Sequence, residues 1–267
     1  MKIDSELVYE VDGLTDFIFL VHARHDDNQC VTDEQLLIDP PHAQRIHVQP
    51  ESGNRQLRIQ AQSGRLTLRY QATVDKRISP IDTQAGQSPI HELPDEVLHF
   101  VMPTRYCESD HLGAAAQQLF VNLEPGYARV QAITEWVRTN ITYRIGSSTA
   151  LTTARDVFVQ RAGVCRDLAH LSVSFCRALN IPARLVAGYS RFPEPPPDFH
   201  ALFEAYIGGR WVMFDPTGMV DPAHVVTIAT GGDAKDVAFA TIFGPARMLS
   251  MRPDVEVLDD GGVTCLG

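Results

Sequence analysis

Apolar and polar residues alternate over much of the first hundred positions, which predicts a series of short β-strands. At residues 57–59 and 66–70 the alternation has a period of two, typical of strands with one face exposed to solvent. Glycine, proline and asparagine residues mark turns between the runs. This spacing is typical of a small antiparallel β-sandwich. The predicted strands span residues 5–9, 15–21, 35–38, 43–48, 57–61 and 66–74.

The pattern changes after an irregular, proline-containing stretch at residues 75–104, which we interpret as a linker. Apolar residues then recur at the three-to-four spacing of amphipathic helices, predicted at 114–120, 127–138 and 164–179. Thr153 and Asp156 resemble a cap that begins another helix. Strands are predicted at 184–189, 199–207, 210–214 and 225–228. We therefore expect an α+β chain with a β-rich N-terminal domain at residues 1–104 and a second domain at residues 105–267.

Composition and charge exclude some classes of partner. The 267 residues include 23 Lys and Arg against 33 Asp and Glu, a formal net charge of −10. This balance argues against nucleic acid or an anionic membrane as the main partner, because both bind basic patches. The longest apolar runs are far shorter than the ~18–20 residues that span a bilayer. Asp4 and Glu6 lie where a signal peptide has its apolar stretch, so we expect the protein to be located in the cytoplasm.

The cysteines are consistent with that location. They are odd in number, widely scattered and without a CxxC pair, which argues against a disulfide framework or a structural zinc site. The five are Cys30, Cys107, Cys165, Cys176 and Cys265.

Cys165 has a position that favours chemistry. It follows Gly163-Val164 and falls in the first turn of the predicted 164–179 helix, at the tip of its buried stripe. Free N–H groups and the helix dipole favour an anion there, which lowers the pKa of a thiol and can stabilise an oxyanion. The alternative is that Cys165 is simply a small buried apolar residue, which is how we interpret the other four cysteines.

A thiolate nucleophile needs a base and a group that orients the base, and one predicted hairpin supplies both. Gly208-Gly209 separates two apolar runs, which indicates a two-residue turn. In that register Leu202 faces Asp215, so His200 and Asp215 become diagonal neighbours on one face. Considered alone, His200 is also explained as a structural histidine. Considered alone, Asp215 is also explained as a turn residue before Pro216.

The motifs together resemble the bacterial transglutaminase-like superfamily. The resemblance rests on the stretches 163–171, 177–184 and 188–189, followed by His200-Ala201, Glu204, and Trp211 with Asp215-Pro216-Thr217. It covers about residues 110–250, and the N-terminal region looks like the β domain that precedes this core in many bacterial members. Two positions depart from the family pattern: Leu202 replaces an aromatic residue, and Gly232 replaces the arginine of a Gly-Arg-Asp sequence.

This resemblance implies a papain-like core in which a central helix packs on an antiparallel sheet. It implies Cys165 as nucleophile, His200 as base and Asp215 as orienting acid, with no metal and no organic cofactor. It leaves the second oxyanion donor open. Tyr143 is a candidate from its place upstream of the helix, with a packed aromatic residue as the alternative.

Three functions remain open. The first is hydrolysis of a peptide or amide bond through a thioester by a cysteine peptidase or amidase. The second is acyl transfer to an amine, and the third is a non-catalytic binding module on the same fold. The segment 192–198 leads into His200 and is expected either to border the cleft or to be a solvated connection. The sequence does not predict the natural substrate or the oligomeric state.

Overall fold

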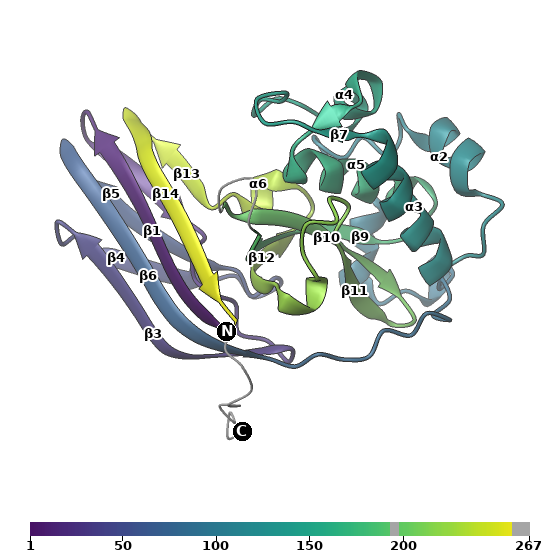
Figure 1. Ribbon diagram of the computed structural model, residues 1–267, viewed down its shortest axis with the longest axis horizontal. Helices are drawn as coiled ribbons and strands as arrows, with labels where there is room; N and C mark the ends of the chain where they lie inside the picture. The colour runs from purple at the N-terminus through teal and green to yellow at the C-terminus, as the bar shows by residue number, and fades with distance from the viewer. Residues whose placement is uncertain (193–197, 258–267) are drawn as a thin grey trace.

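Two four-stranded antiparallel sheets pack face to face at one end of the molecule, beside a unit of helices and a third sheet (Figure 1). The computed structural model describes residues 1–192 and 198–257. One sheet has the strand order β14-β1-β6-β3 and the other β13-β2-β5-β4. Their N-terminal strands are β1 (Lys2–Val11), β2 (Thr15–Phe19), β3 (Gln29–Asp39), β4 (Gln44–Val48), β5 (Arg55–Ala61) and β6 (Gly64–Lys76).

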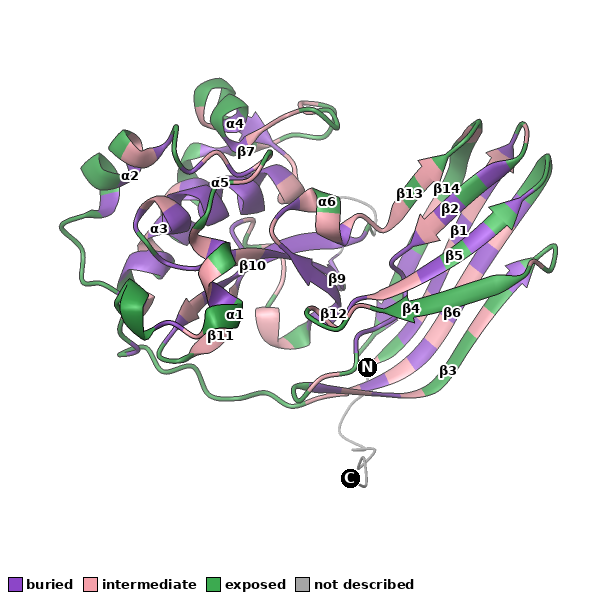
Figure 2. Cartoon of the chain, turned by 180° about the vertical axis from the view of Figure 1, so that it is seen from behind, coloured by how far each residue is buried: buried purple, intermediate pink, exposed green. Residues whose placement is uncertain are grey.

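The period-two pattern explains this sandwich. In β1 every second side chain is buried, and the same alternation runs along β6 (Figure 2). The inward residues, among them Leu7, Phe19 and Leu68, are fully buried between the two sheets. The predicted N-terminal antiparallel β-sandwich is therefore confirmed.

The chain returns to this sandwich at its end. β13 (Ala240–Phe243) pairs with β2, and β14 (Ala246–Glu256) pairs with β1 along its length. The sequence pattern did not predict these two strands. The division into residues 1–104 and 105–267 stays a prediction, and the pairing adds that residues from the second range complete both sheets of the first.

The second unit is built around a four-stranded antiparallel sheet of order β11-β10-β9-β12. Helix α5 (Cys165–Ala178) packs on β9 and β10, which confirms the expected central helix on an antiparallel sheet. Helices α2, α3 and α4 pack against the other sides of α5. The sheet strands are β9 (Ala183–Tyr189), β10 (His200–Ile207), β11 (Arg210–Phe214) and β12 (Val226–Gly231). The remaining elements are η1 (Ile90–Glu92), α1 (Asp95–Leu98), η2 (His99–Val101), α2 (Gly113–Phe120), α3 (Tyr127–Asn140), β7 (Thr142–Tyr143), α4 (Ala154–Gln160), β8 (Ala162–Gly163), η3 (Pro222–His224) and α6 (Ala234–Val237).

Two local predictions set the geometry near the site, and both are confirmed. Thr153 and Asp156 bond to each other's backbone N–H groups and begin α4. The β10–β11 hairpin turns at Gly208-Gly209, where φ is 57° and 75°, values that glycine adopts without strain. The register pairs Tyr206 with Trp211, as predicted.

The cysteine prediction needs one correction. Cys107, Cys165 and Cys176 are free, but Cys30 is disulfide-bonded. The interpretation of Cys30 as a small buried apolar residue was therefore wrong, because this cysteine is only half-buried and is cross-linked. A scattered pattern without a CxxC pair argues against a disulfide framework but does not exclude a single disulfide.

Candidate active site

Cys165 is the first residue of α5, and the residues around it fix where that helix begins. The buried Asp167 carboxylate accepts a hydrogen bond from the Val164 N–H at 2.9 Å, which closes the first turn. Arg166 pairs with the same carboxylate at 2.7 Å. It also donates to Ser148 Oγ at 3.1 Å and the Thr149 carbonyl at 3.0 Å. The Cys-Arg-Asp sequence thus holds the thiol at a helix N-terminus.

Gly163 precedes this turn because no larger residue fits there. A Cβ at this position would lie 2.8 Å from Asp167 Cβ and 3.3 Å from Leu168 Cδ1. The glycine therefore lets strand β8 approach the first turn of α5 closely.

The β10–β11 hairpin brings His200 and Asp215 together. His200 Nε2 lies 3.2 Å from Asp215 Oδ1, and both side chains are almost completely buried. The Cys165 thiol is the other group near the imidazole, and its charge and hydrogen bonding help to raise the pKa of His200. The structure therefore brings the three predicted residues together. Their catalytic roles stay a prediction.

The loop after β11 encloses the Asp215 carboxylate. Oδ1 accepts from Thr217 N at 2.9 Å, and Oδ2 accepts from Met219 N and Val220 N, each at 3.0 Å. The Thr217 hydroxyl donates to both carboxylate oxygens and lies 3.5 Å from His200 Nε2. The sequence motif includes Thr217 in the Asp215-Pro216-Thr217 stretch, but no contact with the carboxylate was predicted from it. An Asp-x-Thr sequence is a signal that could have indicated the bond, because such a threonine reaches back to the carboxylate.

The charges at this site favour an imidazolium. Burial alone would lower the pKa of His200, but hydrogen bonds and charge from Asp215 and Cys165 outweigh it and raise the pKa from 6.5 to about 9. Burial alone would raise the pKa of Asp215, but the bonds from His200 and Thr217 hold it below its usual value. His200 therefore carries a proton at neutral pH, between a carboxylate and a thiol.

Tyr143 lies at the backbone of the candidate nucleophile. Strand β7 pairs parallel to β8, with Tyr143 opposite Gly163, two residues before Cys165. Burial, with the nearby charges of Cys165 and Asp198, raises the pKa of Tyr143 to about 12. The phenol therefore stays protonated close to Cys165. Its role as second oxyanion donor stays a prediction.

Other candidate groups lie outside this site. Cys107 and Cys176 are completely buried, and burial raises the pKa of both thiols, that of Cys107 to about 11. His170 is also buried, and its Nε2 accepts from the Ala234 N–H at 3.1 Å. Within residues 1–192 and 198–257, no group of three or more His, Cys, Asp and Glu side chains could hold a metal ion.

The segment expected to border the cleft is only partly described, because residues 193–197 lie outside the described residues. At its start, the Phe192 ring packs on the His200 ring with 5.4 Å between centroids. At its end, burial raises the pKa of Asp198, and the charge of His200 opposes that rise. Both ends therefore lie beside the imidazole.

Family comparisons match two stretches of the chain. The model of the transglutaminase-like superfamily matches residues 113–216, which include Cys165, His200 and Asp215. The model of the bacterial transglutaminase N-terminal domain matches residues 1–96.

Individual relatives are similar over different lengths. The crystal structure of a "putative cysteine protease" from Cytophaga hutchinsonii is 41% identical, with a TM-score of 0.93 over 98% of this chain and 91% of that one. An uncharacterized protein of Mycobacterium leprae is 33% identical over 156 residues, 54% of this chain and 53% of that protein. One of Mycobacterium tuberculosis is 34% identical over 117 residues, 38% of this chain and 37% of that protein. The chain thus spans about half or less of the length of these curated relatives.

Proposed function

The chain belongs to the transglutaminase-like superfamily, and on that premise we propose that it hydrolyses a peptide or amide bond with Cys165, His200 and Asp215. Cys165 is the nucleophile, His200 the acid and base, and Asp215 the group that orients the ring. The observation that carries this proposal is the position of His200, buried between a thiol and a carboxylate, with its pKa raised to about 9.

The proposed reaction has two halves. The Cys165 thiolate attacks the carbonyl carbon, and the oxyanion forms at the N-terminus of α5. The His200 imidazolium gives its proton to the leaving amine as the C–N bond breaks, which leaves a thioester. Water, deprotonated by His200, then attacks the thioester, and the thiolate leaves as the acid is released. Three side chains and the backbone N–H groups at the N-terminus of α5 act on the substrate and water, so the proposal includes no cofactor.

Substrate screening tests the proposal. Wild-type protein and Cys165→Ala are incubated with a library of fluorogenic peptide amides, with Cys176→Ala as the control for loss of a buried thiol. We expect turnover by wild type and Cys176→Ala and none by Cys165→Ala. Equal turnover by Cys165→Ala would contradict the proposal.

Acyl transfer is the alternative outcome for the same thioester. A primary amine added to the reaction competes with water at the thioester carbon. Mass spectrometry then separates a new amide product from the free acid. A predominant amide would assign transferase rather than hydrolase activity to the same three residues.

The remaining proposals concern location and partners. No helix within residues 1–192 and 198–257 is long and apolar enough to cross a membrane. A cytoplasmic location stays a prediction, and the disulfide at Cys30 weakens the part of it that rested on the cysteines. A peptide or amide substrate is proposed as the partner, and the exclusion of nucleic acid stays a prediction from the net charge of −10.

A further inference from the structure

The N-terminal sandwich holds the outer edge of the sheet that carries His200. β12 is the last strand of that sheet, and side chains of the sandwich bond to its backbone. Gln29 exchanges two hydrogen bonds with the main chain of Thr227, at 2.7 and 2.9 Å. Asn54 does the same with Thr230, at 2.8 and 2.9 Å. Both amide side chains are nearly completely buried, so they take the place of a neighbouring strand.

One charged side chain extends this contact to the loop of the candidate acid. Lys76 is the last residue of β6, and its Nζ donates to the carbonyl oxygens of Pro222 at 2.8 Å and Val225 at 2.6 Å. These two carbonyls belong to the 215–225 loop, which begins at Asp215 and ends where β12 starts. Lys76 thus connects the sandwich to the far end of that loop.

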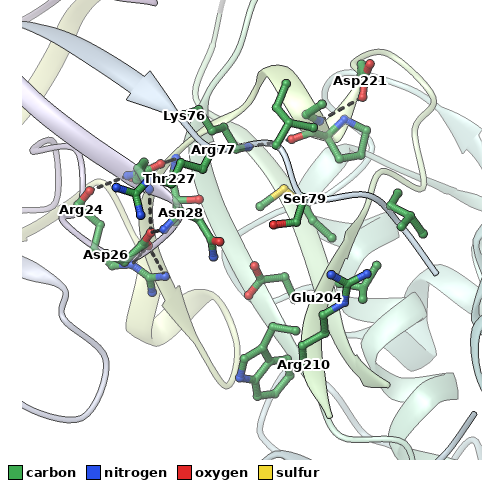
Figure 3. A pocket seen from close by; sticks show the side chains of 18 residues that line it. Arg24, Asp26, Asn28, Lys76, Arg77, Ser79, Glu204, Arg210, Asp221 and Thr227 are labelled. Carbon is green, nitrogen blue, oxygen red and sulfur yellow. Dashed lines mark hydrogen bonds and ion pairs between the residues drawn. The ribbon is translucent and has the colours of Figure 1, made fainter. Parts of the chain in front are cut away.

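The setting of Lys76 is unusual for an ammonium group. It lines a cavity of about 190 Å³ between the two parts of the molecule, together with Glu204 and Asp221 (Figure 3). Burial lowers the pKa of Lys76 to about 8, against the charges of Glu204, Asp26 and Asp221. Its direct hydrogen-bond partners are main-chain carbonyls, to which a charged donor bonds strongly. Burying an ammonium group without hydrogen-bond partners costs free energy. The two carbonyl contacts offset that cost, and they therefore hold this segment of backbone in place.

The near end of the same loop orients the carboxylate. Asp215 Oδ2 is held by the N–H groups of Met219 and Val220, only two to three residues before Pro222. A shift of the loop at Pro222 therefore moves the Met219 and Val220 N–H groups that hold the Asp215 carboxylate. The carboxylate then moves relative to His200 Nε2, its partner. Small displacements of this kind are costly in catalysis, because reacting groups must stay aligned.

We propose that Lys76 is a positioning residue for the candidate triad, through which the N-terminal sandwich fixes the 215–225 loop and so the Asp215–His200 pair. The inference rests on the function proposed above for those residues. It assigns the N-terminal sandwich a part in catalysis although the sandwich supplies none of the three triad residues.

The test compares Lys76→Met, which removes the ammonium, with Arg77→Met. Arg77 is the next residue, is exposed and lines the same cavity, so it is a matched control. Histidine NMR reports the pKa of His200, and hydrogen exchange reports the amides of Met219 and Val220. Both readouts work without a substrate, so they remain informative if the proposed hydrolysis fails.

In Lys76→Met we expect the pKa of His200 to fall from about 9 toward 6.5 and the two amides to exchange at least ~10-fold faster. With a substrate, kcat falls ~10- to 100-fold while KM stays within about twofold. Arg77→Met matches wild type. If Lys76→Met does not fold, Lys76→Gln provides the same comparison. An unchanged pKa of His200 and unchanged amide exchange, even with a lower Tm, would overturn the inference, as would an equal effect in Arg77→Met.

Discussion

Replacing Asp215 with asparagine removes a negative charge 3.2 Å from the buried His200 ring and keeps the size of the side chain. Among the interactions that raise the pKa of His200, the hydrogen bond to Asp215 is the largest. The rise from 6.5 to about 9 corresponds to about 3 kcal/mol of preference for the imidazolium, at about 1.4 kcal/mol per pKa unit. Most of that preference should be lost in Asp215→Asn.

The expected loss of activity follows from protonation. At pH 7.5 an imidazole with a pKa of about 9 is protonated in about 97% of molecules, and one with a pKa of about 6.5 in about 9%. Because the leaving amine needs that proton, Asp215→Asn loses about tenfold in rate from protonation alone. The alkaline limb of the pH–rate profile should move from about 9 toward 6.5, since it reports the loss of the His200 proton.

The assay is the pH dependence of kcat/KM on any substrate found by screening, with histidine NMR as the direct measurement of the same pKa. Glu124→Gln is the control, because it removes an exposed carboxylate outside this loop. The reasoning is refuted if Asp215→Asn keeps its alkaline limb near 9. It is also refuted if Glu124→Gln shifts that limb equally.

Three further predictions concern the supports of the site. Gly163→Ala places a Cβ 2.8 Å from Asp167 Cβ and should cost ~1–3 kcal/mol of stability, measured by urea denaturation, while Gly113→Ala, with open space, should cost nothing comparable. Thr217→Val removes a hydroxyl that donates to the candidate acid and should lower kcat ~10-fold, whereas Thr217→Ser should retain activity. Burial lowers the pKa of His170 to about 4, so the unfolded chain binds more protons below pH 6.5. Stability should therefore fall from pH 6.5 to 4, and His170→Asn should make that fall in urea midpoints shallower, while buried His22, whose pKa is also lowered to about 4, accounts for part of what remains; an equally steep fall would contradict this.

The hairpin shows what local sequence can determine. Two glycines between apolar runs define a two-residue turn, and the turn fixes which side chains share a face. His200 and Asp215 could therefore be paired before any tertiary structure was known. The helix cap formed by Thr153 and Asp156 could also be predicted from the sequence, because its hydrogen bonds join residues only three positions apart.

The missed features depend on contacts between distant residues. β14 is an edge strand whose side chains are mostly exposed, and Pro253 interrupts its pattern, so neither alternation nor propensity indicated it. Lys76 bonds to carbonyls 146 and 149 residues away, a contact that no local pattern encodes.

The central claim is that Cys165 is a nucleophile activated by His200, and alkylation by iodoacetamide tests it most directly. Rates at each cysteine are followed by mass spectrometry from pH 5 to 10 in wild type and His200→Ala. An ordinary thiol with a pKa of ~8.5 is only about 0.3% ionised at pH 6. We predict fast labelling of Cys165 at pH 6 that falls ~100-fold in His200→Ala, with the buried Cys107 and Cys176 unlabelled in both. Labelling of Cys165 no faster than that of glutathione, and unchanged in His200→Ala, would contradict the account and favour a binding module on this fold.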